Sequence, residues 1–352
     1  MEFAFTSEQQ MIADTARSFF AENATSERTR RAMAGDGIDR ALWAAFCQEL
    51  GFSGIGLPEE LGGAGLGLVE MAIIAEAAGA QVAALPMLGS LALCAQAIAA
   101  GGSAAQQQDW LPELISGETI AAYAHAATLT AAGDVLTGEA GFVAHGASAA
   151  VFVVANDRGA WLVRADAPGV QIAGLTTMDQ TRPYARVTLS GAVGEPLAQP
   201  AQAIAAAHRA GFVVAAAEAL GGAQACLDRT VAYAKDRIQF GRPIGSFQAY
   251  KHRLADMMIE IEQARSAVYW AACAVDEGAE EAELAGHAAK SFAADTYFMC
   301  AGNMIQLHGG IGFTWEHDAH LFFKRARALQ TILGNGTWHR ECVASMILGD
   351  VA

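Results

Sequence analysis

The stretch from Asp236 to Gln248, which separates two long helical patterns, constrains the fold of this 352-residue chain most strongly. The second pattern begins near Ser246. Gly241 and Gly245 permit a sharp bend, and Pro243 fixes one backbone angle. The stretch therefore predicts a corner between two helices.

The side chains of this corner suit a ligand that carries both a phosphate and a ring. Arg237 offers a planar guanidinium whose paired N–H groups match phosphate oxygens. Phe240 offers a flat apolar face, and Gln239 and Gln248 offer amide donors and acceptors. A purely structural corner is the alternative, because Arg and Phe are common at helix ends. Spacing alone leaves the two interpretations open.

Helical, β-rich and helical segments follow one another along the chain. Residues 1–118 show mainly helical periodicity. Between 119 and 198, short runs of β-branched and aromatic residues alternate with Gly, Asp and Asn, which indicates a small β-barrel or sandwich. Residues 199–352 return to long periodic segments, which predict an up-down four-helix bundle. The predicted fold is mostly α with a β middle domain (α+β).

Particular residues mark several expected helix ends. Thr6 or Ser7 can cap the first helix, whose first turn carries Glu8. Gly79 can end a helix that starts near Val69. The helices of the last domain are expected at residues 202–236, 246–278, 281–307, 318–330 and 337–348.

Composition disfavours several function classes. The formal net charge is −15, which makes nucleic acid or an anionic membrane an unfavourable partner. The six cysteines lack C-x-x-C spacing and are typical of reduced residues in a cytoplasmic protein, with a cysteine nucleophile as the alternative. The uncharged run Ala77–Gln108 is long enough to span a membrane, but Pro, Gly and polar residues interrupt it. We expect a buried helix there.

Three ordered motifs resemble those of the acyl-CoA dehydrogenase family of flavoproteins. The corner reads R-x-Q-F-G-x-x-I-x-x-F-Q from Arg237 to Gln248. Gln306–Thr314 is similar to the family's Q-x-x-G-G-x-G-[YF] segment, and Leu57–Gly65 is similar to its L-P-E-x-x-G-G-x-G segment. The resemblance covers nearly the whole chain. It implies the same three-part layout, FAD as cofactor, and α,β-dehydrogenation of an acyl-CoA thioester.

The resemblance also implies that FAD lies between subunits. One subunit's β-domain holds the isoalloxazine, and the partner's corner and glycine segment hold the pyrophosphate and adenosine. A glycine cluster also ends helices in proteins without a flavin, so that segment alone is a weak signal. The cofactor-binding residues implied in this chain are Arg237, Gln239, Phe240, Ile244, Gln248, Gln306, Gly309, Gly310 and Thr337.

The family's catalytic base is missing from both of its known places. Most members carry a Glu before Gly-Thr near the C-terminus, where this chain has Asn335, and Asn accepts no proton at neutral pH. A minority carry it on the helix before the corner, where this chain has Gly211, followed by Phe212 in place of a substrate-contacting Arg. Glu218, further along that helix, is an alternative base, although a paired structural carboxylate is the favoured interpretation. Glu316 is a weaker candidate.

The β-domain departs from the family pattern as well. Ala121–Thr128 replaces the T-E-P-x-x-G-S-D segment, and Ala140–His145 replaces K-x-W-I-T-N. Phe142 stands where a Trp covers the flavin, and Ala144 where a Thr bonds it. The half-site for the isoalloxazine is therefore weakened, while the half-site that reaches into a partner is retained.

No metal site is expected. His317 and His320 lie near carboxylates in the sequence, but no further run of ligands supports a metal. A capped helix start at Asp318 is the better interpretation.

The asymmetry between the two half-sites predicts a subunit of a mixed complex. Such a subunit supplies its corner and glycine segment to FAD held by a different, base-bearing subunit, as in bacterial family members that act on steroid side-chain thioesters. A homo-oligomeric dehydrogenase with Glu218 as a relocated base is one alternative, and a pseudoenzyme scaffold is another. The implied partners are an acyl-CoA, an electron-transfer flavoprotein or similar acceptor, and another such subunit or a second copy in a dimer or tetramer. The sequence does not distinguish a fatty-acid from a steroid substrate, or a dehydrogenase from an oxidase.

Overall fold

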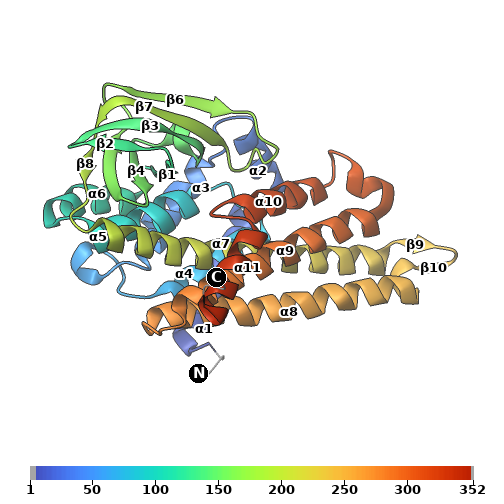
Figure 1. Cartoon of the computed structure of the whole chain (residues 1–352). Coiled ribbons are helices and arrows are strands. Elements are labelled where there is room, and N and C mark those ends of the chain that lie inside the picture. The colour runs from blue at the N-terminus through green and yellow to red at the C-terminus, as the bar shows by residue number, and fades with distance from the viewer. Residues whose placement is uncertain (1–4, 350–352) are drawn as a thin grey trace. The chain divides into compact units, whose positions relative to one another are not determined.

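The computed structural model describes residues 5–349 and divides into two compact units (Figure 1). The first, the helical unit, comprises the residues up to 26, 68–83 and those from 212 onward. The second, the mixed unit, comprises residues 27–67 and 84–211. The three-domain division at residues 118 and 198 stays a prediction.

Long helices build the helical unit, at nearly the places that the sequence predicts. Thr6 caps α1 with a complete capping box, in which its side chain accepts from the Gln9 amide at 3.2 Å. The helices are α1 (Ser7–Asn23), α4 (Leu68–Ala80), α7 (Pro200–Asp236), α8 (Gln248–Asp276), α9 (Ala282–His308), α10 (Ala319–Thr331) and α11 (Gly336–Leu348), with the last part of α7 belonging to this unit. Helix α9 packs against α8, α10 and α11 and so lies at the centre of the bundle.

Helices α4 and α7 cross at two glycines. Helix α4 ends at Ala80, one residue after the predicted Gly79, but Gly79 has a different use from the predicted one. Gly79 lies inside α4, where an added β-carbon would clash with the carbonyl oxygen of Glu218. Gly221 on α7 reciprocates, since a β-carbon there would clash with the carbonyl oxygen of Glu76. Gly79 is therefore required for close backbone approach and not for termination.

The mixed unit combines short helices with a β-domain. The helices are α2 (Ser26–Met33), α3 (Arg40–Ala44), α5 (Gln96–Gly101) and α6 (Ala104–Ser116), with short η turns of 3₁₀ or π type at Ala45–Glu49, Phe52–Gly54, Glu59–Leu61, Met87–Ala95 and Gly146–Ser148. The run Met87–Ala95 packs against β1 (Ala121–His125), and the Ser90 hydroxyl accepts a 3.1 Å hydrogen bond from the Ala121 amide. This contact orients one face of β1.

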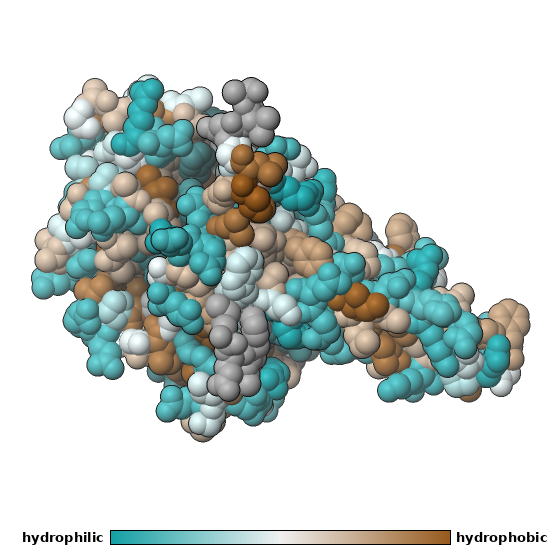
Figure 2. All heavy atoms as spheres, turned by 60° about the horizontal axis from the view of Figure 1, so that its bottom comes forward, coloured by the Kyte–Doolittle hydropathy of each residue, from teal (hydrophilic) through white to brown (hydrophobic). Residues whose placement is uncertain are grey.

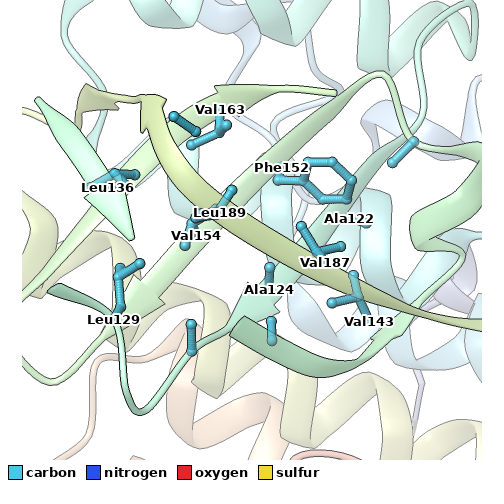
Figure 3. Close-up of a cluster of buried hydrophobic side chains, with 14 residues drawn as sticks. Ala122, Ala124, Leu129, Leu136, Val143, Phe152, Val154, Val163, Val187 and Leu189 are labelled. Atoms are coloured by element: carbon cyan, nitrogen blue, oxygen red, sulfur yellow. The ribbon is translucent and has the colours of Figure 1, made fainter. Parts of the chain in front are cut away.

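Two sheets form the β-domain, and their facing side chains make its core (Figure 3). One sheet has the order β1-β4-β5-β8 and the other β2-β3-β7-β6. The strands not yet located are β2 (Thr130–Ala132), β3 (Val135–Ala144), β4 (Val151–Asn156), β5 (Gly159–Arg164), β6 (Val170–Leu175), β7 (Tyr184–Val193) and β8 (Glu195–Pro196). Phe152, Leu189 and Val187 lie in the core between the sheets. The predicted fold class is confirmed.

One local prediction needs correction. Within the predicted β-domain, the sequence runs Val135–Gly138 and Phe142–His145 indicate two separate strands, but a single strand, β3, covers Val135–Ala144 and keeps pairing with β7 across irregularities in its register. Within the uncharged run, the helical segment Met87–Gly101 is mostly buried, as predicted. Among the described residues, helix α7 is long and apolar enough to cross a membrane. Its apolar window is 89% buried inside the structure, as in the core helix of a folded domain.

Candidate cofactor and active site

The predicted corner is a short hairpin between α7 and α8. Strands β9 (Ile238–Gln239) and β10 (Arg242–Pro243) pair antiparallel, and the turn between them places Phe240 and Gly241 in the left-handed region, with φ of 54° and 75°. The Ile244 amide closes the corner by donating to the carbonyl of Arg237 at 2.8 Å. The left-handed turn turns Phe240 outward, since its side chain is 92% exposed.

The side chains of Arg237, Gln239 and Gln248 at the corner are exposed to solvent. Among the described residues, none forms an ion pair or a side-chain hydrogen bond with Arg237. Gln239 donates only to the carbonyl of its neighbour Ile238, at 2.9 Å, and Gln248 is exposed in the first turn of α8. Figure 2 shows apolar and hydrophilic side chains together on this end of α7 and α8, at the right of the view. An exposed guanidinium and an exposed ring on the same corner fit a phosphate-bearing ring ligand.

The glycine segment follows the end of α9 and forms a second open surface. Gly309 has φ of 66°, and a β-carbon on Gly309 or Gly310 would meet nothing within 4 Å. Gly312 differs, because a β-carbon there would lie 2.7 Å from the Ile305 carbonyl oxygen. Gly312 therefore serves packing, whereas Gly309, Gly310 and the exposed Gln306 leave room for an incoming molecule.

Contacts among three helices bring the corner and the glycine segment to the same end of the helical unit. The hydroxyl of Tyr250, in the first turn of α8, donates to the Leu307 carbonyl at 2.6 Å. The ring of His308 stacks on that of Tyr233, near the end of α7, with centroids 4.4 Å apart. The corner (Arg237–Gln248) and the glycine segment (Gln306–Thr314) are far apart in the sequence but form one surface. We call it the corner surface.

Asn335, at the family's base position near the C-terminus, has a structural role. Asn335 is the N-cap of α11, and its side-chain oxygen accepts a hydrogen bond from the Trp338 amide at 2.9 Å. Asn is a favoured capping residue because its short side chain reaches the free amides of the first turn. The loop before it is bent: Leu333 and Gly334 both lie at positive φ, 57° and 102°.

Phe212, at the second departure from the family pattern, belongs to a cluster of rings that is buried apart from the exposed Trp338. Its ring centroid lies 4.8 Å from that of His287 and 4.9 Å from that of His339. Trp338 packs against both histidines. We call these four residues the ring cluster. The helical unit thus brings Phe212 and the Asn335 loop to the same place, and apolar and aromatic groups pack there.

Two buried histidines in the ring cluster share a hydrogen bond. The Nδ1 atoms of His287 and His339 lie 2.7 Å apart, so one ring donates and the other accepts. Burial, followed by the nearby Lys290 and His287, lowers the pKa of His339 to about 3. Burial also lowers the pKa of His287. Both rings are therefore neutral at neutral pH.

Lys290, on α9, lies beside the ring cluster and is 99% buried. Its ammonium donates to the Gly334 carbonyl at 2.6 Å. Burial lowers its pKa to about 8, with Asp295 opposing the shift. Sequence reasoning missed this group, although His287 and Lys290 lie one turn apart on a single helix face and offered a signal.

The other carboxylates weighed as bases differ in their surroundings. Glu218 is buried and forms an ion pair with the equally buried Arg325 of α10. This is the paired arrangement that sequence analysis favoured. Glu316 lies on the surface after the glycine segment.

The histidines near Glu316 have ring partners. The His317 ring packs on His308 at 4.5 Å and accepts from the Ala319 amide at 3.1 Å, while His320 packs against Trp315. Asp318 is the N-cap residue of α10, but its side chain makes no capping bond. Across residues 5–349, the structure groups no three His, Cys, Asp or Glu side chains in a metal-binding arrangement.

In the mixed unit, the residues that replace the flavin-contacting motif lie on β3. Phe142 is 79% exposed, and Ala144 is buried at the end of the strand. Ala144 has no hydroxyl with which to bond a flavin, and the Ala121–Thr128 segment forms strand β1 and the turn after it.

Comparison with known proteins decides the family. A family model described as the acyl-CoA dehydrogenase N-terminal domain matches residues 6–118, and one described as the C-terminal domain matches residues 205–348. The chain belongs to the acyl-CoA dehydrogenase family. The two matches flank the β-domain. The predicted resemblance is confirmed, and so, for the family, is FAD as cofactor.

Relatives of this acyl-CoA dehydrogenase include members of mixed complexes. The acyl-CoA dehydrogenase IpdE2 of Mycobacterium tuberculosis is 38% identical over 93% of each chain. A structure of the ChsE4–ChsE5 complex of the same organism matches with TM-score 0.93 and 29% identity over 100% of both chains. A variant of the Tcur3481–Tcur3483 steroid acyl-CoA dehydrogenase matches with TM-score 0.90 and 32% identity, over 97% of this chain and 98% of that one.

The corner surface fits the adenosine and diphosphate parts of FAD. It has an exposed guanidinium, an exposed aromatic ring, and two glycines at which an added β-carbon would meet nothing within 4 Å. Thr337 lies elsewhere. It follows the loop held by Lys290, and Lys290 and Gln306 are about 24 Å apart along α9. Thr337 and the corner surface therefore lie at different places in the helical unit.

Proposed function

We propose that this acyl-CoA dehydrogenase is the base-lacking subunit of a mixed, FAD-dependent complex. It supplies the corner surface to an FAD that a different, base-bearing subunit chiefly holds. The capping role of Asn335 carries the proposal, because a side chain that caps α11 at the family's main base position takes no α-proton. Phe212, packed in the ring cluster beside it, agrees with this reading.

Each residue of the corner surface has a task toward the cofactor. The Arg237 guanidinium binds the diphosphate, and the Phe240 ring packs against the adenosine side. Gly309 and Gly310 let their backbone approach the cofactor closely, because no β-carbon stands in the way. Gln239, Gln248 and Gln306 bond its polar edges, while Ile244 closes the corner through its amide.

The chemistry is divided between the subunits. When bound, FAD accepts the hydride that leaves the β-carbon of the acyl-CoA. The partner's carboxylate removes the α-proton, and this chain orients the cofactor and closes the site. The reaction is α,β-dehydrogenation, with electrons passing on to an electron-transfer flavoprotein or a similar acceptor.

The named relatives favour a bulky acyl group over a simple fatty acyl chain. One is called a steroid acyl-CoA dehydrogenase, and another is a complex of two differently named subunits. We infer a ring-bearing acyl-CoA as substrate. The six cysteines are free, which is consistent with a cytoplasmic location.

Two alternatives make different predictions. A homo-oligomeric enzyme would need Glu218 as base, but its carboxylate is buried and paired with Arg325. A pseudoenzyme scaffold would bind no flavin in any complex. The buried Glu218–Arg325 pair disfavours the first alternative, and the exposed corner surface disfavours the second.

Purification of the chain alone, and together with a co-expressed, base-bearing family member, tests the proposal. We expect a stable mixed complex that is yellow, contains FAD and reduces an artificial electron acceptor with a ring-bearing acyl-CoA. We expect the lone chain to be colourless and inactive. Full FAD occupancy with dehydrogenation by the lone chain would overturn the proposal.

A further inference from the structure

The loop Leu333–Asn335 is held in an unfavourable backbone conformation. Leu333 has φ of 57°, a left-handed value that non-glycine residues seldom adopt. Gly334 follows at 102°, and a β-carbon there would clash with the Trp338 ring. Such conformations persist where surrounding contacts over-determine them.

Lys290 makes the contact that fixes this loop. Its ammonium donates to the Gly334 carbonyl at 2.6 Å, and only 1% of the residue is exposed. Burying a lysine is costly, so its place in the core calls for a specific partner. The loop carbonyl is that partner. The loop is fixed from its other side by Asn335, which caps α11.

Two cations lie at this segment: Lys290 donates to the Gly334 carbonyl, and the Arg340 guanidinium lies beside Gly336 at the start of α11. Asp295, on the same helix as Lys290, is shared with Arg340 of α11 at 2.9 Å and with Gln330 of α10 at 2.7 Å. The neutral rings of His287 and His339 lie beside Lys290, and Glu283 acts on His287 from the same helix. The Phe212 ring contributed by α7 brings no charge.

We propose that Lys290 is the positioning residue of the Leu333–Thr337 segment, and that by holding the Gly334 carbonyl it sets the position of Thr337, for which the family resemblance implies a contact with FAD. The part concerning the cofactor rests on the proposed function. The part concerning the loop does not. Lys290 lies on α9. None of the family motifs in this sequence includes that part of the helix.

Hydrogen exchange in the lone chain tests the loop first. Lys290→Met keeps the apolar stem and removes the donor. We expect the amides of residues 333–338 to exchange about tenfold faster, the order of one charge-assisted hydrogen bond. Thr230→Val is the control. It removes another fully buried hydrogen bond, from the Thr230 hydroxyl to the Cys226 carbonyl at 2.6 Å, on α7.

The control separates positioning from general stability. If Thr230→Val lowers the melting temperature as much as Lys290→Met does but leaves exchange of the 333–338 amides unchanged, Lys290 acts on the loop. If both variants speed exchange equally, or if Lys290→Met leaves it unchanged, the inference is overturned.

FAD affinity of the mixed complex, followed by flavin fluorescence, tests the second part. We expect Lys290→Met to weaken FAD binding about tenfold, and Thr230→Val to leave it unchanged. The wild-type affinity is expected to fall as pH rises through about 8, where Lys290 loses its charge, while the Lys290→Met profile stays flat. Equal affinities and equal profiles would overturn this part. A wild-type complex that binds no FAD would overturn the proposed function, while the exchange data would still judge the loop.

Discussion

Arg325 of α10 and Glu218 of α7 form an ion pair inside the helical unit, with 3% and 8% of their side chains exposed. A buried pair is costly to break, because the remaining charge keeps its desolvation penalty. The Glu218 carboxylate, the nearest alternative base on α7, therefore has a structural role.

We expect Glu218→Gln to destabilise the fold by about 3 kcal/mol while sparing the chemical step. Urea denaturation of the variant, and the turnover of its folded mixed complex, are the measurements. The double variant Glu218→Leu, Arg325→Met is the matched control, since an apolar replacement of both partners recovers most of the loss. A stable Glu218→Gln protein whose turnover falls a thousandfold would instead make Glu218 the base.

The crossing of α4 and α7 predicts sharp intolerance at two glycines. Gly79→Ala and Gly221→Ala place a methyl group against the carbonyls of Glu218 and Glu76, and we expect each to cost about 2–3 kcal/mol. Gly302→Ala on α9 is the control, because a β-carbon there meets nothing within 4 Å. Alanine favours helix over glycine, so the control should gain up to about 1 kcal/mol. Equal effects at all three positions would show that the crossing is not tight.

Much of the fold was predictable from periodicity. The last helices lie within a few residues of the expected ranges, as α7 does at Pro200–Asp236 against 202–236. Gly79 was misjudged because glycine both ends helices and allows them to touch, and only the partner backbone distinguishes the two uses. Strand β3 was divided in two because its glycines resemble turns, while pairing with β7 carries the strand through.

The candidate site was predictable only where it is encoded in contiguous motifs. Arg237, Phe240 and Gly309 lie in such motifs, and their placement on one surface follows from contacts such as that of Tyr250 with Leu307. The ring cluster was not predictable in this way. His287 and His339 belong to different helices, and only the packing of α9 against α11 brings their rings together.

Acid should destabilise the protein through the buried histidines. The pKa of His339 is lowered in the folded state, so its contribution to stability is complete above about pH 6.5 and is lost as pH falls toward about 3. The unfolded chain takes up the proton in that window and the folded chain does not. Each such group gives a slope of about 1.4 kcal/mol per pH unit.

Urea midpoints at pH 7.5 and pH 5.5 check this prediction. We expect the wild-type midpoint to fall at pH 5.5, and His339→Phe to reduce that fall. His252→Asn, which alters an exposed histidine on α8, should leave the pH dependence unchanged. An identical fall in His339→Phe would contradict the buried, neutral assignment.

The corner surface should govern cofactor affinity in the mixed complex. We expect Arg237→Gln to weaken FAD binding by about tenfold to a hundredfold, because a charge-assisted contact to the diphosphate is lost. Phe240→Ala should weaken it less, by about tenfold. Titration with flavin fluorescence measures both. Lys235→Gln, at the exposed end of α7, is the matched charge control and should have no effect.

The central claim is that this chain completes a cofactor site on another subunit and has no working site of its own. The ratio of flavin to protein in the purified mixed complex, read from its absorption spectrum, tests this most directly. The account predicts one FAD for each pair of unlike chains, and none on the lone chain. One FAD on every chain, or a yellow and active lone chain, would contradict it.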